Sequence, residues 1–93
     1  MENKQVRWRL RCWGQVQRVG FRYTALYLAR RLKLIGWVRN LTDGSVQMEA
    51  QGDVAQVRQF LIRLKAQPHI HIEKTVIEEL PLQQREKQFR VLS

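Results

Sequence analysis

The chain has 93 residues, the size of one small domain, and we treat residues 1–93 as that single domain. Its lone cysteine, Cys12, excludes an internal disulfide. With only two histidines, His69 and His71, which we interpret as surface residues, the sequence shows no cluster of metal ligands. No apolar run is long enough to span a membrane, and the N-terminus lacks the apolar segment of a signal peptide. We therefore expect a cytoplasmic monomer without metal, other cofactor or membrane partner.

The positive charge of the chain is unevenly placed. Residues 1–42 hold ten lysines and arginines against one acidic residue, whereas residues 43–93 hold seven residues of each sign. The whole net charge of +9 therefore lies in the first half of the chain. Such a field concentrates anions near the surface, and it fits a small anionic ligand, a nucleic acid or simple solubility.

The first predicted elements are a strand, a loop and a helix. Apolar residues and arginines alternate over Val6–Cys12, which predicts a strand with one apolar and one basic face and a buried thiol on the apolar side. Residues 14–20 form a loop with a glycine at each end. Over Phe21–Leu32 the apolar residues fall at helical spacing, and we interpret Gly36 as a stop signal just past this helix.

Two strands joined by a hairpin come next. Residues Trp37–Leu41 predict a strand, Asp43-Gly44 is a strong signal for a tight turn, and alternation over residues 46–51 predicts the partner strand. We expect Asp53 to cap the helix that follows, with Gln56 as its capping-box partner.

The last part of the chain predicts one helix and two strands. Apolar residues fall at helical spacing over residues 54–64. The β-branched segment Ile70–Leu80 predicts a strand whose imperfect alternation indicates a bulge or an edge position. Pro81 ends this strand, and Phe89–Leu92 predicts a short final one.

The order of these elements, β-α-β-β-α-β with a short terminal strand, places the chain in the α+β class. A ferredoxin-like sandwich, with two helices on one face of an antiparallel sheet, is one of the few compact solutions for this order. The opposite face of the sheet would then show Arg7, Arg9 and Arg11 beside Gln47 and Glu49.

The loop before the first helix is a candidate anion site. Gly14 and Gly20 allow sharp turns and a close approach of backbone N–H groups to a ligand. The N–H groups at a helix start have no intrahelical partner, and Arg22 in the first turn adds a guanidinium that matches phosphate oxygens. The spacing alone also fits a solvated helix arginine, because many strand-to-helix connections contain glycine.

Asn40 is a second candidate, because asparagine is disfavoured inside strands and this one lies near a strand end. One interpretation is a residue that prepares the turn. The other is a neutral amide that orients a water molecule by donating and accepting hydrogen bonds.

Two stretches resemble the signatures of the acylphosphatase family. The segment 14–23, GQVQRVGFRY, is similar to the first signature, and the segment 36–46, GWVRNLTDGSV, is similar to the second. Two motifs at this mutual spacing are more specific than either alone, and the element order of the whole chain also fits the family.

The resemblance implies a small cytoplasmic enzyme that hydrolyses the carboxyl–phosphate bond of acyl phosphates without a metal or a covalent intermediate. It implies two catalytic residues, Arg22 to bind the phosphoryl group and Asn40 to position the attacking water. The implied phosphate-binding residues are Val16, Gln17, Arg18, Val19 and Gly20, through their backbone N–H groups, together with Arg22. The expected partners are the acyl phosphate and the phosphate product.

The chemistry agrees with this implication. An acyl phosphate has a good leaving group, so charge stabilisation and water placement can suffice. Neither motif holds a histidine, cysteine or carboxylate at an obvious general-base position, and turn chemistry explains Asp43 better. One residue departs from the family, since Arg18 stands where the first signature usually has glycine. If that position needs a positive φ, the side chain costs about 1 kcal/mol or more. It could also add a second cation beside the site.

Two other functions stay open at the level of sequence. A ferredoxin-like sheet can present a basic, aromatic face to RNA, and Arg7, Arg9, Arg11 and Trp13 share one strand face. However, Gln47, Glu49 and Gln51 occupy the third strand where an RNA-recognition signature would have aromatics, and the arginines can instead pair with acids across the sheet. We do not expect nucleic acid to be the main partner. The second alternative, suggested by Arg18, is a catalytically weakened member that binds an anion or a protein partner.

Overall fold

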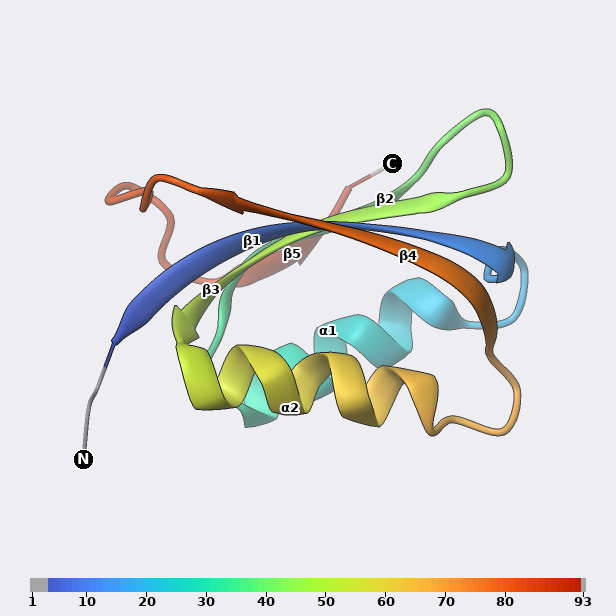
Figure 1. Ribbon diagram of the computed structural model, residues 1–93, viewed down its shortest axis with the longest axis horizontal. Helices are drawn as coiled ribbons and strands as arrows, with labels where there is room; N and C mark the ends of the chain where they lie inside the picture. The colour runs from blue at the N-terminus through green and yellow to red at the C-terminus, as the bar shows by residue number, and fades with distance from the viewer. Residues whose placement is uncertain (1–3, 93) are drawn as a thin grey trace.

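The structure, a computed structural model that describes residues 4–92, has two helices on one face of a five-stranded sheet (Figure 1). The elements in chain order are β1 (Gln5–Gln15), α1 (Phe21–Arg31), β2 (Ile35–Asn40), β3 (Val46–Asp53), α2 (Val54–Lys65), β4 (His71–Leu80) and β5 (Phe89–Val91). This arrangement confirms the predicted ferredoxin-like α+β sandwich. Among the described residues, no helix has both the length and the apolar character to cross a bilayer.

The strands lie in the order β4-β1-β3-β2-β5. The first four pair antiparallel with their neighbours, as predicted. The short β5 instead pairs parallel with β2, so the sheet is mixed. The reason is the connection through residues 81–88, which leaves β4 at one edge and returns to the opposite edge in the direction of β2.

The apolar faces of the strands and helices form one core. Its fully buried members include Leu10 and Cys12 of β1 and Phe60 of α2. Phe60 meets Phe89 of β5 edge to face, with ring centroids 5.8 Å apart, so the terminal strand is held against α2. Burial raises the pKa of the Cys12 thiol, as expected of a structural cysteine.

The end of α1 differs from the prediction. The helix ends at Arg31, and Lys33 adopts the left-handed conformation after it, with a φ of 60°. Gly36 lies inside β2 instead, with a φ of 139°. A Cβ at Gly36 would lie 1.8 Å from the carbonyl oxygen of Glu49. Close approach of β3 therefore explains this glycine, and the interpretation as a helix stop is wrong.

The start of α2 also differs. Asp53 occupies the N-cap position, but its side chain makes no capping hydrogen bond, so the predicted capping box with Gln56 does not form. Backbone satisfies one of the free N–H groups at this helix start instead. The N–H of Val54 donates to the carbonyl of Lys4, just before β1, at 2.9 Å.

β4 lies at an edge of the sheet and also carries a bulge. Both features predicted from its irregular alternation are therefore present. The register with β1 shifts between Trp13 and Gly14, which leaves Glu73 as the extra residue. Gly14 has a φ of 129°, and a Cβ there would lie 2.2 Å from the carbonyl oxygen of His71. The bulge thus requires glycine inside β1, which continues to Gln15, so the loop predicted for residues 14–20 begins two residues later than expected.

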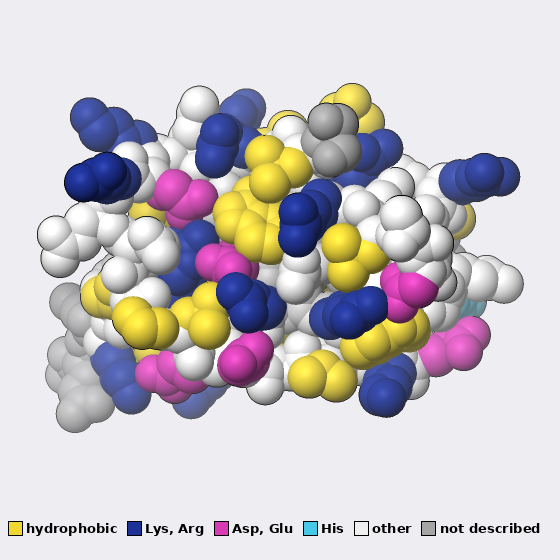
Figure 2. Space-filling model, turned by 90° about the horizontal axis from the view of Figure 1, so that it is seen from above, with side chains coloured by type: hydrophobic (Ala, Val, Ile, Leu, Met, Phe, Trp, Pro, Cys, Tyr) yellow, Lys and Arg dark blue, Asp and Glu magenta, His cyan; other side chains and the backbone are white. Residues whose placement is uncertain are grey.

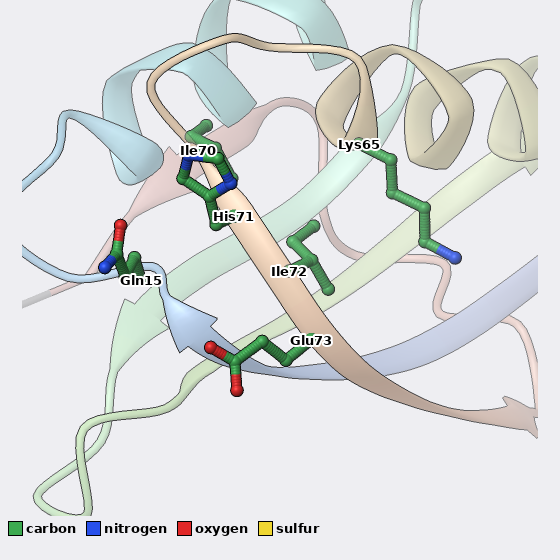
Figure 3. A pocket seen from close by; sticks show the side chains of 6 residues that line it. All are labelled: Gln15, Lys65, Ile70, His71, Ile72 and Glu73. Carbon is green, nitrogen blue, oxygen red and sulfur yellow. The ribbon is translucent and has the colours of Figure 1, made fainter.

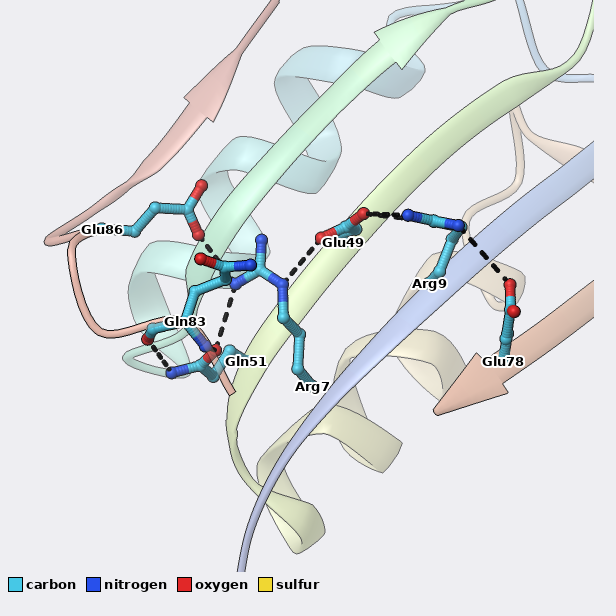
Figure 4. Close-up of polar contacts among 7 residues, drawn as sticks. All are labelled: Arg7, Arg9, Glu49, Gln51, Glu78, Gln83 and Glu86. Atoms are coloured by element: carbon cyan, nitrogen blue, oxygen red, sulfur yellow. Dashed lines mark hydrogen bonds and ion pairs between the residues drawn. The ribbon is translucent and has the colours of Figure 1, made fainter. Parts of the chain in front are cut away.

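The outer face of the sheet carries a network of ion pairs (Figure 4). Arg7, only 2% exposed, lies 2.7 Å from Oε1 of Glu49 and 2.7 Å from Oε1 of Glu86. Arg9 lies 2.9 Å from Oε2 of Glu49 and 3.6 Å from Glu78. Figure 2 shows the same face, with acidic side chains interspersed among basic ones. The predicted pairing across the sheet is confirmed, and this local neutralisation does not favour a nucleic-acid surface.

Candidate active site

Residues from the loop, α1 and β2 meet in a cleft of about 150 Å³. Its lining residues are Val16, Arg18, Gly20, Phe21, Arg22, Tyr23 and Asn40. The fold therefore brings the two predicted catalytic residues, Arg22 and Asn40, to one cleft. Of the predicted phosphate-binding residues, Gln17 and Val19 do not line it. Figure 1 shows why the segments meet, because the loop after β1 and the hairpin between β2 and β3 lie at the same end of the sheet.

The start of α1 supplies free backbone donors to this cleft. Gly20 is the N-cap residue and adopts the left-handed conformation, with φ 77° and ψ 17°. The first backbone hydrogen bond of the helix runs from the N–H of Thr24 to the carbonyl of Gly20 at 3.0 Å. The N–H groups of Phe21, Arg22 and Tyr23 therefore have no intrahelical acceptor. Together with the helix dipole they form a site suited to an anion.

Arg18 occupies the left-handed region, with a φ of 63°. An L-residue with a side chain pays about 1 kcal/mol there compared with glycine. The strain anticipated for this departure from the family motif is therefore present in the backbone. Because Arg18 also lines the cleft, its guanidinium adds positive charge to the anion site.

We call Arg18 and Arg22 the site arginines, and Arg7, Arg9 and Arg11 the sheet arginines. Each of the sheet arginines forms an ion pair with a carboxylate. Among residues 4–92, neither site arginine forms such a pair. Their charge is thus available to a ligand, which the count of basic residues in the sequence could not show.

The side chain of Gln17 has a role that the sequence reasoning missed. Its Nε2 donates to the carbonyl of Leu41 at 2.7 Å and to the carbonyl of Ser45 at 2.9 Å. These two hydrogen bonds tie the loop directly to the hairpin that follows Asn40. Gln17 is therefore a positioning residue that connects the two motifs, and its place in the first motif was its only sequence signal.

Asn40 is the last residue of β2 and pairs in register with Val46. Its Oδ1 is buried and accepts no hydrogen bond from another described residue. Buried acceptors are rarely left without a donor, because the loss of solvation costs about 1–3 kcal/mol. An amide oxygen of this kind on the cleft wall is suited to accept a hydrogen bond from water or from a ligand.

The hairpin beside Asn40 is held by Asp43. Its carboxylate accepts hydrogen bonds from the N–H and the hydroxyl of Ser45, and from Arg11. These interactions lower the pKa of Asp43 from 3.8 to about 2, and the hydrogen bonds from Ser45 contribute most. The carboxylate is thus engaged in the turn, as expected from its position, and it does not line the cleft.

A larger hollow of about 440 Å³ lies at the start of β4 (Figure 3). Its lining residues are Gln15, Lys65, Ile70, His71, Ile72 and Glu73. In Figure 3 the side chain of Lys65 points away from those of His71 and Glu73, so its charged groups do not converge on one point. His69 and His71 are both exposed, as expected. The smaller cleft, where polar groups do converge, is the better candidate for chemistry.

Comparison with known proteins agrees with the geometry. A sequence model of the family described as acylphosphatase matches residues 8–91. The acylphosphatase of Pediococcus pentosaceus is 48% identical over 71 residues, which cover 74% of this chain and 79% of that protein. The acylphosphatase of Geobacillus thermodenitrificans is 41% identical over 80 residues, covering 85% of each chain. The crystal structure of acylphosphatase from Bacillus subtilis matches with a TM-score of 0.88 at 29% identity, covering 95% of this chain and 99% of that one. This chain is a member of the acylphosphatase family.

Proposed function

We propose that the protein hydrolyses acyl phosphates to a carboxylate and inorganic phosphate, without a metal or a covalent intermediate. The oxygen of a water molecule attacks phosphorus, and the bond from phosphorus to the acyl oxygen breaks. The carboxylate leaves with that electron pair, and the protons of the water pass to the phosphate product and the solvent. Family membership supports this activity. The observation that carries the residue assignment is the convergence on one cleft of a helix start suited to an anion and the Oδ1 of Asn40, which has no hydrogen-bond partner within residues 4–92.

The phosphoryl group is held by backbone N–H groups of residues 16–20 and by the guanidinium of Arg22. Two features support an anion at this place, the N–H groups of Phe21, Arg22 and Tyr23 without an intrahelical acceptor directly after the loop and the absence of an ion pair at Arg22 within residues 4–92. Donors fixed before the reaction stabilise the charge that develops on the phosphoryl oxygens. Arg18 adds a second cation at the rim.

Asn40 orients the attacking water. Its Oδ1 accepts one hydrogen of the water, which directs an oxygen lone pair toward phosphorus. A strong general base is not required, because the carboxylate is a good leaving group and the transition state of phosphoryl transfer is loose. Placement of the water and stabilisation of charge then account for the rate enhancement.

The test is hydrolysis of acetyl phosphate by the parent, Arg22→Ala and Asn40→Ala in the presence of a chelator. We expect metal-independent turnover in the parent and a loss of about 10²–10³-fold in kcat/KM in each variant, the size found when a preorganised donor is removed. Arg58→Ala is the matched control, because Arg58 is an exposed arginine on α2. It should retain the kcat/KM of the parent.

Circular dichroism must show that each variant is folded. Normal turnover in folded Arg22→Ala or Asn40→Ala would contradict the role of that residue, and absence of turnover in the folded parent would contradict the proposed activity. The buried lone thiol of Cys12 fits a reducing compartment, so we place this activity in the cytoplasm. All the proposed groups come from one chain, which is consistent with a monomer.

A further inference from the structure

A second groove adjoins the candidate cleft along α1. Its volume is about 420 Å³, and its lining residues are Tyr23, Leu26, Tyr27, Arg30 and Arg31. Tyr23 lines both this groove and the cleft that contains Arg22 and Asn40. The two hollows therefore meet at the first turn of the helix.

The groove presents two aromatic rings that lie outside the hydrophobic core. Tyr23 is 69% exposed and Tyr27 is 60% exposed, whereas the core-facing side of α1 is formed by other residues, among them Phe21 and Ala25. The two tyrosines are four residues apart, so they share one helix face about one turn, or roughly 5 Å, apart. Large exposed aromatic side chains of this kind are typical of surfaces that bind a ligand.

The second tyrosine is held in place by its neighbour. Nη1 of Arg31 donates to the hydroxyl of Tyr27 at 3.0 Å, and the guanidinium carbon lies 5.4 Å from the ring centroid. This contact restrains the ring on the helix surface. The groove is therefore partly ordered before any ligand arrives, which reduces the entropy lost on binding.

An acyl phosphate has two parts, and the proposed function uses only one of them. With the phosphoryl group at the start of α1, the acyl group must extend out of the small cleft. Phosphoryl transfer needs the water and the leaving group roughly in line on opposite sides of phosphorus. Asn40, which orients the water, comes from β2, whereas Tyr23 comes from α1. Both residues line the small cleft, and the groove that shares Tyr23 with this cleft offers the leaving acyl group the apolar surfaces of Leu26 and the two tyrosine rings.

We propose that Tyr23, Leu26 and Tyr27 form an acyl-binding surface that makes the enzyme prefer acyl phosphates with an aromatic or extended apolar acyl group. This inference rests on the proposed function. Tyr23 contacts the part of the acyl group next to the carboxyl carbon, and Tyr27 contacts what lies one helical turn further. The contacts persist in the transition state, so they raise kcat/KM for the larger substrates.

The experiment compares kcat/KM for benzoyl phosphate and acetyl phosphate in the parent, Tyr23→Ala, Tyr23→Phe and Ile62→Ala. For each protein we divide kcat/KM for benzoyl phosphate by kcat/KM for acetyl phosphate. Comparison of this ratio with that of the parent cancels the different intrinsic reactivities of the substrates. We expect Tyr23→Ala to lower this ratio by about three- to tenfold, the value of one aromatic contact. Tyr23→Phe keeps the ring and should keep the ratio. Ile62→Ala, which removes an exposed apolar side chain from α2, should also keep it.

A longer substrate tests the second turn. Biphenyl-4-carbonyl phosphate reaches further along α1, so Tyr27→Ala should lower its kcat/KM relative to benzoyl phosphate. An unchanged ratio in Tyr23→Ala, with normal turnover of acetyl phosphate, would overturn the acyl-binding surface and leave the proposed function intact. An unchanged preference in Tyr27→Ala would overturn its extension to the second turn. Failure of the folded parent to hydrolyse either simple substrate would overturn the proposed function itself.

Discussion

The sheet arginines and the site arginines carry the same charge on the same half of the chain, but the fold uses them differently. Arg7 and Arg9 are bound to Glu49 across the sheet, and Arg11 is bound to Asp43 in the hairpin. Arg18 and Arg22 line a cleft beside free backbone N–H groups. The comparison shows that charge pairing, rather than the number of charges, separates a structural arginine from one available to an anion.

The largest expected effect concerns stability and involves Arg7. Removal of one partner from a buried ion pair leaves the other uncompensated, so we expect Arg7→Ala to lower the free energy of unfolding by about 3 kcal/mol or more. Arg9→Ala is the matched control on the same strand face, because the Arg9 side chain is 41% exposed. It should lose less than about 1 kcal/mol. Urea denaturation measures both values. Equal losses in the two variants would show that burial does not distinguish the sheet arginines.

Gln17 tests the connection that brings the site arginines to Asn40. Its replacement by alanine removes one donor from the carbonyls of Leu41 and Ser45, each of which still accepts from a backbone N–H of the hairpin, and we expect a loss of about 0.5–1.5 kcal/mol in unfolding free energy. Since a small displacement of the reacting groups slows the reaction strongly, kcat/KM for acetyl phosphate should fall about tenfold or more. Gln59→Ala, an exposed position on α2, is the control. Parent-like kcat/KM in Gln17→Ala would mean that the loop keeps its place without this side chain.

Arg18 allows backbone strain and charge to be separated. Arg18→Gly relieves the positive φ, so the free energy of unfolding should rise by up to about 1 kcal/mol. Arg18→Ala keeps the strain but removes the charge. Both variants should bind inorganic phosphate about threefold more weakly at low salt, as measured by inhibition of acetyl phosphate hydrolysis. If phosphate inhibition stays at the parent level in both variants, Arg18 adds nothing to the anion site.

The smallest expected effect is a pH dependence at the hairpin. The pKa of Asp43 is lowered from 3.8 to about 2 in the folded protein, chiefly by Ser45 and to a lesser extent by Arg11. The ionised carboxylate therefore contributes stability above its unfolded pKa of 3.8, and this contribution is lost as pH falls through about 2. Thermal unfolding between pH 5 and pH 2 should show a smaller decline for Asp43→Asn than for the parent. Parallel declines would show that other carboxylates control acid stability.

The sequence predicts the fold well where a single periodicity decides the structure. The alternation over Val6–Cys12 and the helical spacing over Phe21–Leu32 identify the apolar faces because burial selects residues at those intervals. The prediction fails where backbone from a distant segment intervenes. Gly36 is required by the close approach of β3, and the first N–H of α2 is bound by the carbonyl of Lys4 instead of a capping side chain.

The candidate site was also predictable only where local sequence decides the structure. Arg22 and Asn40 could be singled out because a guanidinium in a first helical turn can reach a bound anion and asparagine is disfavoured inside strands, and the family resemblance supplied their roles. The side-chain hydrogen bonds of Gln17 and the groove lined by Tyr23 and Tyr27 could not be predicted. They depend on where the hairpin and the helix lie relative to the loop, which no local pattern contains.

The use of main-chain donors at the start of α1 has a consequence for mutagenesis. Alanine retains the N–H group of the residue that it replaces, so an alanine scan through the loop would leave this part of the site chemically intact. The informative change at such a position is one of backbone shape. Gly20 has a φ of 77° and no atom within 4 Å of an added Cβ, so Gly20→Ala introduces strain without a steric clash. The effect of this substitution on activity therefore reports on the direction of the peptide N–H groups, which substitutions that change only side chains do not test.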